Sequence, residues 1–534
     1  MAKTKIVIDP ITRIEGHLRV TCVVENGKVT DAWNTCTLFR GFEIFMKDRD
    51  PRDTWHFAMR ICGVCPTPHG WNSVRAVEEA MGIGKMDDNT RLVRNMMEAS
   101  QIGYDHILWF YVLNAFDYVN VPNALRAKPS TPSLKAVQDQ VRAVVESGQL
   151  GPFADQFWDH PGYKLPPELD LELTAHYLQA IEAQQKANDA GGVFMGGKFP
   201  HIMNYAPGGL TQLPPLEQIM TYKSLMAEVA DFIDTIMIPD LLAIAPFYLD
   251  LAKVGKGHGN YLSWGVLDEK SQDPYERVFP RGGLFATNVA HSTLFSPAPF
   301  DLRKVDPDQT STFTKYSWYG DEVGAGKHPL DAGQEPIEFT SLQALDDPNP
   351  PSGKYDWTQA VRYGKDDAPM EVGPLAQMLI SYASGRPQAK QLVDSTLKAI
   401  GAPGRLDLLE SDLGRIAARV LKAKINADNA QRWADELLAN IGAGNLTVNS
   451  MPSVPESGTG KGGWDAPRGA LCHYIRIKDH KVASYAAVPA SNWNFSPRDD
   501  KGVRGPVEEA LVGHSVEDPS KPLELLRLVH TFAP

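Results

Sequence analysis

The strongest constraint on the fold of this chain is one long stretch with helical spacing. Apolar residues recur at three- and four-residue steps over residues 92–110, just after Asp88 and Asn89, either of which can cap a helix. Residues 107–116 are apolar on nearly every side of such a helix. A helix with no polar face is stable only when other helices surround it. The sequence therefore predicts a helical bundle around this stretch.

Both ends of the chain predict β-structure instead. Residues 6–8 and 18–24 are strand-like, and Asn26-Gly27 is a strong hairpin-turn signal. Near the other end, a turn at 478–480 separates two strand-like runs, 471–477 and 482–488. Further helices are expected at 171–189, where Gly191-Gly192 is a plausible stop, and at 216–229, 375–384 and 406–441. We expect a mainly α protein with some β (α+β), in which β-structure from the N- and C-terminal segments flanks a large helical-bundle core.

We expect a single large domain over residues 1–534. Its N-terminal β segment spans about 1–50, its helical core about 53–300 and 371–450, and its C-terminal β segment about 465–534. Residues from about 300 to 370 are rich in Pro, Gly and Asp and lack periodicity, which predicts an irregular insertion between the two parts of the core.

Composition excludes several classes of protein. The 534 residues are 43% hydrophobic and 22% charged, as in ordinary globular proteins. The formal net charge of −12 argues against a nucleic-acid partner. The N-terminus lacks the apolar core of a secretion signal, and the most apolar stretch, 232–254, is interrupted by aspartates and prolines. We therefore expect neither a signal peptide nor a membrane span in this chain.

The sharpest chemical signal is a pair of cysteines, Cys62 and Cys65, in the segment 60–66. Two thiols at this spacing can bind one metal ion or close a redox disulfide. As thiolates they favour zinc, copper(I), iron–sulfur or nickel sites over magnesium or calcium. Two buried cysteines without a chemical role are the third possibility. The scattered remaining cysteines are expected to be small buried hydrophobic residues: Cys22, Cys36 and Cys472.

Two further segments carry candidate polar groups. Arg13, Glu15 and His17 are alternate residues and are expected to share one face of a strand. Glu15 is then either a proton-transfer group or part of a solvated Arg–Glu pair. Arg468 follows Pro467 in a turn, where its planar guanidinium either binds an anion or polar ligand or lies on the surface.

Taken in order, these segments resemble the large subunit of nickel–iron hydrogenases. The resemblance extends over essentially the whole chain and rests on the number and order of its blocks. In addition to 9–17 and 60–66 with His69, they are 39–43, 49–53, 105–107, Gly196-Gly197-Lys198, 315–319, 371–375, 466–471, 506–511 and 518–534.

The resemblance implies an active site in which nickel and iron are bridged and iron carries carbon monoxide and cyanide. Four cysteine-type ligands come from two CxxC pairs, one near each end of the chain. In this chain Cys62 resembles a terminal nickel ligand and Cys65 a ligand that bridges nickel to iron. His69 is implied beside the bridging sulfur.

The same resemblance assigns roles to polar residues around that centre. Glu15 resembles the carboxyl group that relays protons, and Arg468 the guanidinium above the open metal position, held by Asp105. The cofactor pocket would also include Pro467 and Ser491, the latter near a cyanide, although 490–492 departs from the usual Pro-Ser-Thr. A separate carboxylate, Glu43, resembles a ligand of a buried magnesium (or iron) site.

The implied reaction is the reversible oxidation of H2 to protons and electrons. The chain lacks a cysteine set for iron–sulfur clusters, so the resemblance implies a heterodimer with an iron–sulfur small subunit that carries them. Exported relatives travel with that subunit. We therefore expect a periplasmic or membrane-associated protein, with the cytoplasm as the alternative, that reaches the membrane only through partner subunits.

One departure from the family concerns the second cysteine pair. The family continues after Leu-Leu-Arg-Leu-Val-His as Asp-Pro-Cys-x-x-Cys-x-x-His, whereas here the residues are Thr531-Phe532-Ala533-Pro534. In selenium-containing relatives the first residue of that pair is selenocysteine, whose codon is otherwise read as a stop. Truncation at that codon would give this ending, a partial sequence would look identical, and the coding sequence beyond codon 534 tests the hypothesis. The alternatives are an inactive apo subunit, a non-catalytic relative such as the complex I quinone-reductase subunit, and a simple dithiol redox or zinc protein.

Overall fold

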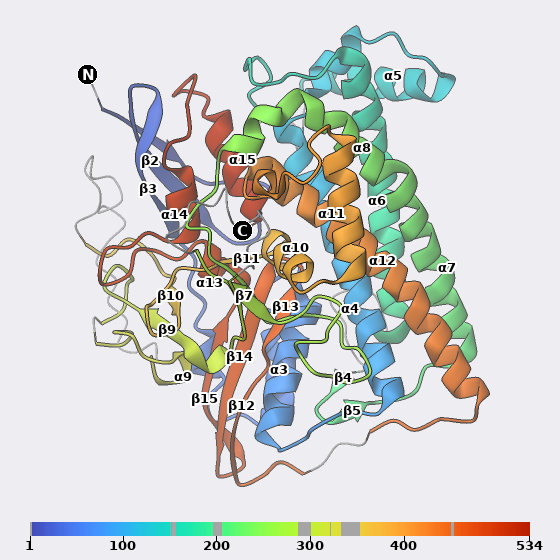
Figure 1. Cartoon of the computed structure of the whole chain (residues 1–534), viewed down its shortest axis with the longest axis vertical. Helices are drawn as coiled ribbons and strands as arrows, with labels where there is room; N and C mark the ends of the chain where they lie inside the picture. Colours follow the sequence, from blue (N-terminus) through green and yellow to red (C-terminus); the bar gives the residue numbers. More distant parts are fainter. Residues whose placement is uncertain are drawn as a thin grey trace.

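Four long helices form the core of the molecule and run side by side on the right of Figure 1: α4 (Asp88–Leu108), α6 (Pro167–Met195), α7 (Leu216–Phe232) and α12 (Asp412–Gly442). The structure is a computed structural model. It describes residues 3–149, 151, 156–195, 205–286, 301–320, 322–332, 353–449 and 453–533. The apolar side chains between these helices make up the largest hydrophobic cluster. The bundle predicted from the 92–116 stretch is therefore present.

The central helix α4 is buried along nearly all of its length and continues into a π-helical segment, Trp109–Asn114. Its N-cap is Asp87, whose carboxylate accepts a hydrogen bond from the Thr90 backbone N–H at 2.9 Å, so the cap lies one residue before the predicted ones. Helix α6 does not stop at Gly191. A Cβ atom at Gly191 would lie 3.1 Å from the Cβ of Ser100 on α4, so this glycine lets the two helices approach closely.

The shorter helices pack either on the four long helices or on the sheets, and α5 lies at the top of the molecule in Figure 1. Three of them belong to the N-terminal part of the chain: α1 (Phe42–Phe45) and α2 (Thr54–Ala58) precede the cysteine pair, and α3 (Pro66–Ala80) follows it. The others are α5 (Pro132–Ser147), α8 (Ile238–Ile244), α9 (Pro329–Ala332), α10 (Pro374–Ala383), α11 (Pro387–Ala399), α13 (Ala490–Asn494), α14 (Pro506–Leu511) and α15 (Leu523–Phe532).

The N-terminal sheet is antiparallel, with strand order β1 (Thr4–Ile8), β2 (Leu18–Glu25) and β3 (Lys28–Cys36). Asn26 and Gly27 both have positive φ, as a two-residue hairpin turn requires. The apolar face of this sheet packs against side chains of α14 and α15, so the two ends of the chain share one hydrophobic cluster. The terminal segments therefore depend on each other for burial.

The C-terminal sheet consists of β12 (Ser457–Lys461), β13 (Trp464–Ala466), β14 (Gly469–Lys478) and β15 (Lys481–Val488), with β14 pairing with the other three. Helix α3 lies directly on it. Cβ atoms at Gly458, Gly460 and Gly462 would fall 1.9–2.2 Å from backbone oxygens of α3, so only glycine permits this approach. From Ala490 to Ala533 the chain forms three short helices, α13, α14 and α15, which are joined by loops.

Short strands form three further sheets in the described part of the chain. One sheet has the order β11 (Glu371–Val372), β6 (Tyr261–Ser263), β7 (Gly282–Leu284) and β8 (Leu302–Arg303). Two pairs complete the set: β9 (Thr310–Phe313) with β10 (Ala360–Tyr363), and β4 (Tyr205–Ala206) with β5 (Gly209–Leu210). The described part of the 300–370 segment thus contributes β8, β9 and β10. The predicted α+β class is confirmed.

The helical run Leu216–Lys253 is long and apolar enough to cross a membrane by length and composition. In this structure its side chains Ile219, Tyr222, Met226 and Val229 are fully buried, and its first part, α7, packs against α6 and α12. The run therefore serves here as a helix of the bundle.

Candidate functional site

Cys62 and Cys65 lie in the turn between α2 and α3, and Cys65 is the N-cap residue of α3. Both thiols are buried, and the backbone N–H of Cys65 donates to Cys62 Sγ at 3.2 Å. A hydrogen bond from the Cys65 side chain lowers the pKa of Cys62, with a further contribution from the positive charge of Arg468. The same bond and burial raise the pKa of Cys65. The pair is therefore arranged to hold a thiolate on Cys62.

Glu15 reaches this turn, but not from a strand. Residues 9–17 form a loop between β1 and β2 with positive φ at Arg13, so the expected shared strand face of Arg13, Glu15 and His17 is wrong. Instead, Glu15 Oε1 accepts a hydrogen bond from the Gly63 backbone N–H at 2.7 Å. A Cβ atom at Gly63 would lie 2.9 Å from that oxygen. The half-buried carboxylate therefore lies against the segment between the two cysteines.

Arg468 lies in the turn between β13 and β14 and is buried. Its Nη1 donates to Asp105 Oδ2 on α4 at 2.5 Å, and the negative charges of Asp105 and the two thiols raise the pKa of Arg468 although burial opposes this. Its Nε and Nη2, like Asp105 Oδ1, have no hydrogen-bond partner among the described residues. Buried donors of this kind normally have a partner. Two N–H directions are thus available to a bound group.

The turn that carries Arg468 is held by a contact between two glycines. Gly373 and Gly469 have φ values of 131° and 128°, and a Cβ atom at Gly469 would lie 2.4 Å from the Gly373 nitrogen. Glycine is the residue that adopts this conformation without strain. The contact presses the arginine turn against the start of α10.

The end of α15 lies beside this turn. Thr531 and Phe532 line a small cavity together with Gly373 and Arg419, and the Trp109 indole N–H donates to the His530 carbonyl at 2.9 Å. Gly373 in turn lies next to the Arg468 carbonyl. Segments from opposite ends of the sequence therefore meet at the same buried place.

A buried aspartate fixes α15 there. Asp117 accepts hydrogen bonds from Arg13 at 2.5 Å and from His530 Nδ1 at 2.6 Å, and His530 Nε2 lies 2.9 Å from the Thr12 carbonyl. Burial opposes ionisation of Asp117, but Arg13 and His530 outweigh it and lower its pKa to about 2. Sequence reasoning missed this group because nothing local in 12–13, 117 or 530 indicates that they meet.

His69 lies on α3, four residues after Cys65, and is buried. Its Nδ1 lies 3.0 Å from Nε2 of His473 on β14. Burial, with a smaller effect of the charge on Arg40, lowers the pKa of His69 to about 3, so the ring is neutral. His473 was not predicted, although its strand was.

The structure also describes three other predicted site residues, Pro467, Ser491 and Glu43. Pro467 is buried in the arginine turn, and Ser491 lies half-buried in the first turn of α13; no hydrogen bond of the described residues joins its side chain to either thiol. Glu43 Oε1 accepts from the Ala487 N–H at 3.2 Å beside a cavity of about 260 Å³, and burial raises its pKa to about 7. The block Gly196-Gly197-Lys198 lies outside the described residues.

Comparison with known proteins agrees with this geometry. The family model described as nickel-dependent hydrogenase matches residues 40–534, and a model described as HoxL-like matches residues 5–35. The chain belongs to the nickel-dependent hydrogenase family. It is 39% identical to the hydrogenase-2 large chain of Escherichia coli (strain K12), over 99% of this chain and 96% of that one. It is 37% identical to the uptake hydrogenase large subunit of Rhizobium leguminosarum bv. viciae, over 99% and 94%.

Solved hydrogenase structures have the same fold. The Ni-Fe-Se hydrogenase from D. vulgaris Hildenborough in the reduced state matches with a TM-score of 0.82 and 32% identity, covering 100% of this chain and 98% of the matched chain. The protein is thus a hydrogenase large subunit with a nickel–iron centre. These relationships favour that function over a simple dithiol redox or zinc protein.

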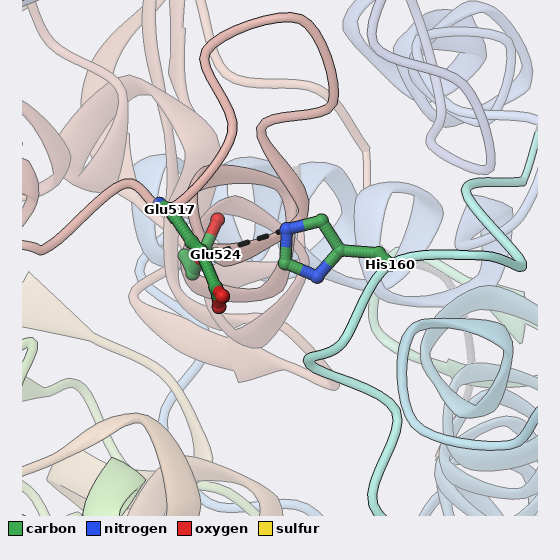
Figure 2. A group of neighbouring side chains, drawn as sticks. All are labelled: His160, Glu517 and Glu524. Atoms are coloured by element: carbon green, nitrogen blue, oxygen red, sulfur yellow. Dashed lines mark hydrogen bonds and ion pairs between the residues drawn. The ribbon is translucent and has the colours of Figure 1, made fainter.

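A second group of potential metal ligands occurs elsewhere in this hydrogenase chain, formed by His160, Glu517 and Glu524 (Figure 2). Their ligand atoms lie within 4.8 Å of one another, and His160 Nε2 is 3.8 Å from Glu524 Oε1. However, His160 Nδ1 accepts the Gly162 backbone N–H at 2.9 Å. A neutral ring that accepts at Nδ1 carries its proton on Nε2, the atom that faces the carboxylates. Metal-bound histidines instead donate from the second nitrogen, so this group does not fit a cation.

Proposed function

We propose that Cys62 and Cys65 hold the nickel–iron centre and that the iron carries carbon monoxide and cyanide. The residues fit such a group. Both thiols are buried in one turn beside a buried cation that favours the thiolate form, and thiolates suit soft transition metals. The other cysteines, Cys22, Cys36 and Cys472, lie in strands. Within this chain the pair therefore provides the sulfur donors, and a four-thiolate centre needs two more.

The reaction that this arrangement supports is the reversible oxidation of H2 to protons and electrons. When bound, the metal pair supplies the electron-rich centre at which dihydrogen is split. Glu15 takes up the proton, because its carboxylate lies on Gly63 between the thiols and is half-exposed on its other side. Arg468, held by Asp105, contributes a fixed positive charge and two oriented N–H groups without rearrangement.

We propose an iron–sulfur small subunit as the partner in a heterodimer. A hydrogenase must pass electrons onward, and this chain offers no spare cysteine cluster for an iron–sulfur centre. The exposed apolar side chains Leu38 and Phe45 lie near the turn of the cysteine pair, where Arg40 Nη1 donates to the Arg60 carbonyl at 3.0 Å. Co-purification with the neighbouring gene product tests the partner. Isolation of an active large subunit without any partner would overturn the proposed heterodimer.

Two further assignments accompany this function. Glu43 provides one oxygen ligand to a magnesium (or iron) ion, because its carboxylate is held by a backbone N–H beside a roomy cavity.

The second assignment is the location: the subunit is exported with its partner and acts in the periplasm or at the membrane. Cell fractionation tests the location, and hydrogenase activity confined to the cytoplasmic fraction would overturn it.

The observation that carries the proposal is the meeting of the Cys62–Cys65 pair, the Arg468–Asp105 ion pair and Glu15 at one buried place. The decisive experiment is metal analysis of the heterodimer together with H2-dependent dye reduction. Nickel and iron in the purified complex are expected. Zinc alone, or no metal in an intact complex, would contradict the proposal.

The role of Glu15 has its own test. In the Glu15→Gln variant kcat is expected to fall by about 10²-fold or more, because the proton acceptor is removed, while nickel and iron content stay unchanged. Glu25→Gln, an exchange of a carboxylate at the end of β2, is the control and should leave kcat unchanged. Equal activity of the two variants would remove Glu15 from the mechanism.

A further inference from the structure

The backbone at Val372 and Gly373 is the surface against which the Arg468 turn lies. A Cβ atom at Gly469 would fall 2.8 Å from the Val372 carbonyl carbon, and one at Gly373 would fall 3.1 Å from the Arg468 carbonyl oxygen. Because neither glycine has a side chain, backbone lies directly on backbone. In a close-packed interior a shift of one segment is passed to the other. The place of Arg468 therefore depends on what holds residues 372–373.

One buried asparagine holds Val372 from the side of α13. Asn494 Nδ2 donates to the Val372 carbonyl at 2.9 Å, and Asn494 Oδ1 accepts the Val372 backbone N–H at 3.0 Å. The side chain is 1% exposed. A carboxamide offers the same donor and acceptor as a peptide group, so a single side chain pairs with both polar groups of the Val372 backbone. These two hydrogen bonds tie β11 to the end of α13.

A bidentate ion pair ties the preceding residue to α12. Arg415 Nε and Nη2 donate to the two carboxylate oxygens of Glu371, each at 2.8 Å, and both side chains are at most 4% exposed. Arg415 Cζ lies 3.9 Å from the centre of the Phe532 ring on α15. Two parallel N–H···O bonds restrict the angle between the partners as well as the distance. Glu371 therefore fixes β11 relative to α12 and α15.

The Arg468 turn is also held on its N-terminal side. Asp465 on β13 accepts the Trp264 backbone N–H at 2.9 Å and a hydrogen bond from the Gln377 amide at 2.8 Å. Gln377 lies in the first turn of α10, and its backbone N–H donates to the Gly373 carbonyl at 2.9 Å. The beginning of α10 is therefore joined to β13, and the residues that anchor β11 complete the contacts around the turn.

We propose that Glu371 and Asn494 are positioning residues that hold this backbone in place and thereby aim the unpartnered N–H groups of Arg468. Among the described residues, Asp105 is the hydrogen-bond partner of this guanidinium, and it binds Nη1 alone. The direction of Nε and Nη2 therefore depends on where the backbone of the turn lies. In the described part of the chain, neither Glu371 nor Asn494 hydrogen-bonds to Arg468 or to a thiol, so both act through residues 372–373. The inference rests on the proposed role of Arg468 at the metal centre.

Glu371→Gln in the purified heterodimer tests the inference. The change keeps the shape of the side chain but removes one of the two oxygens that the Arg415 fork binds. Arg415 Nη1 still lies 3.4 Å from Asp412 Oδ1, so its charge retains a partner. We expect unchanged nickel and iron content and a fall in kcat of about 10-fold, less than the cost of a full misplacement by about 1 Å.

Glu78→Gln is the matched control. Glu78 on α3 also forms a buried bidentate pair, with Arg94 at 2.8 and 3.3 Å, but Arg94 lies about three turns before Asp105 on α4. Both exchanges remove a buried charge and should lower the midpoint of chemical denaturation. Only Glu371→Gln should lower kcat. Equal kcat in the two variants would overturn the proposal.

Hydrogen exchange gives a readout that does not depend on turnover. Amide exchange of residues 466–471, which span the Arg468 turn and the start of β14, should become faster in Glu371→Gln. In Glu78→Gln it should stay as in the wild type. A general loss of stability would speed exchange in both variants alike. Unchanged protection of residues 466–471 in Glu371→Gln would therefore refute the positioning role.

Asn494→Ser approaches the same backbone from α13 and decides the matter if Glu371→Gln does not fold. The shorter serine cannot pair with both polar groups of Val372, so residues 466–471 should exchange faster and kcat should fall. Asn89→Ser is its control, because Asn89 also donates to backbone carbonyls, at 2.9 and 3.1 Å, but at the opposite end of α4 from Asp105. Normal kcat and normal exchange in Asn494→Ser would contradict the inference.

Combination with Arg468→Lys shows whether Glu371 acts through this arginine. Lysine has no planar fork to aim, so in the Arg468→Lys background Glu371→Gln should lower kcat by less than about twofold. A loss as large as in the wild-type background would mean that Glu371 acts elsewhere, and would overturn the inference. An Arg468→Lys variant with wild-type kcat would instead count against the proposed function, so the two failures are distinguishable.

Discussion

The Cys62–Cys65 pair and the His160–Glu517–Glu524 group both gather potential metal ligands, yet their surroundings differ. Around the cysteines, Arg468 favours the thiolate, and its spare N–H groups have no described protein partner. In the other group, the His160 lone pair already accepts a backbone N–H. The comparison teaches that closeness of ligand atoms does not make a metal site. A metal site also needs ligand atoms whose lone pairs are available and neighbouring groups that have no protein partner.

The largest expected effect comes from removing a thiol. Cys62→Ser or Cys65→Ser should abolish both nickel binding and H2 oxidation, because a serine hydroxyl is a hard, protonated and poor ligand for nickel. Nickel per heterodimer and dye reduction are the measurements. Cys472→Ser, in a strand core, should keep its nickel. Full nickel content in Cys62→Ser or Cys65→Ser would show that the cysteine pair is no more a metal site than the His160 group.

The next effect tests the charge beside the thiols. Arg468→Lys keeps the charge but loses the planar fork that binds Asp105 and directs two N–H groups inward. We expect kcat to fall about 10²- to 10³-fold while nickel is retained, the range found when one oriented donor is lost. Steady-state kinetics on metal-replete enzyme measures this. A change of less than about threefold would show that orientation of this donor is unimportant.

A third effect concerns how α15 is held beside the turn that carries Arg468. Asp117→Asn should lower the free energy of unfolding by about 3 kcal/mol, because it leaves Arg13 without its buried counter-charge. Hydrogen exchange of α15 amides reports the loosening. Unchanged protection of α15 would show that this contact does not hold the helix.

The same aspartate sets a pH dependence. Its folded pKa, about 2, lies below the unfolded value of about 3.9. Its contribution to stability is therefore complete above about pH 4 and is lost as the pH falls toward 2. In wild-type protein α15 should lose exchange protection over this interval. In Asp117→Asn this part of the pH dependence should disappear.

The smallest effect belongs to the second ligand group. His160→Ala should leave nickel, iron and kcat unchanged and lower the free energy of unfolding by about 2 kcal/mol, since it removes a buried, hydrogen-bonded ring. Metal analysis and chemical denaturation measure both. Loss of a bound metal in this variant would contradict our assignment of the group.

Sequence reasoning predicted the parts of the fold that are encoded locally. The α4 bundle follows from apolar spacing, and the turns at Asn26-Gly27 and 478–480 follow from residues that accept positive φ. It failed at 9–17, because positive φ at Arg13 breaks the alternation that a strand would have. Nothing within that segment predicts that Arg13 binds Asp117, which lies 104 positions away in the sequence.

The candidate site shows the same division. Cys62 and Cys65 are visible because their spacing is itself the chemical signal. Arg468 and Asp105 are 363 positions apart, and only the resemblance to a family joined them in advance. His473 escaped notice because a buried strand gives no reason to single out one residue over its neighbours. Its contact with His69 depends on α3 lying on the sheet, which in turn depends on glycines in β12.

The shared cluster of the two chain ends has a consequence for biosynthesis. The apolar face of the β1–β3 sheet emerges from the ribosome first, whereas α14 and α15, which cover it, are made last. At roughly 5–20 residues per second the nascent sheet stays uncovered for tens of seconds or longer. During that interval the growing polypeptide needs shielding against self-association.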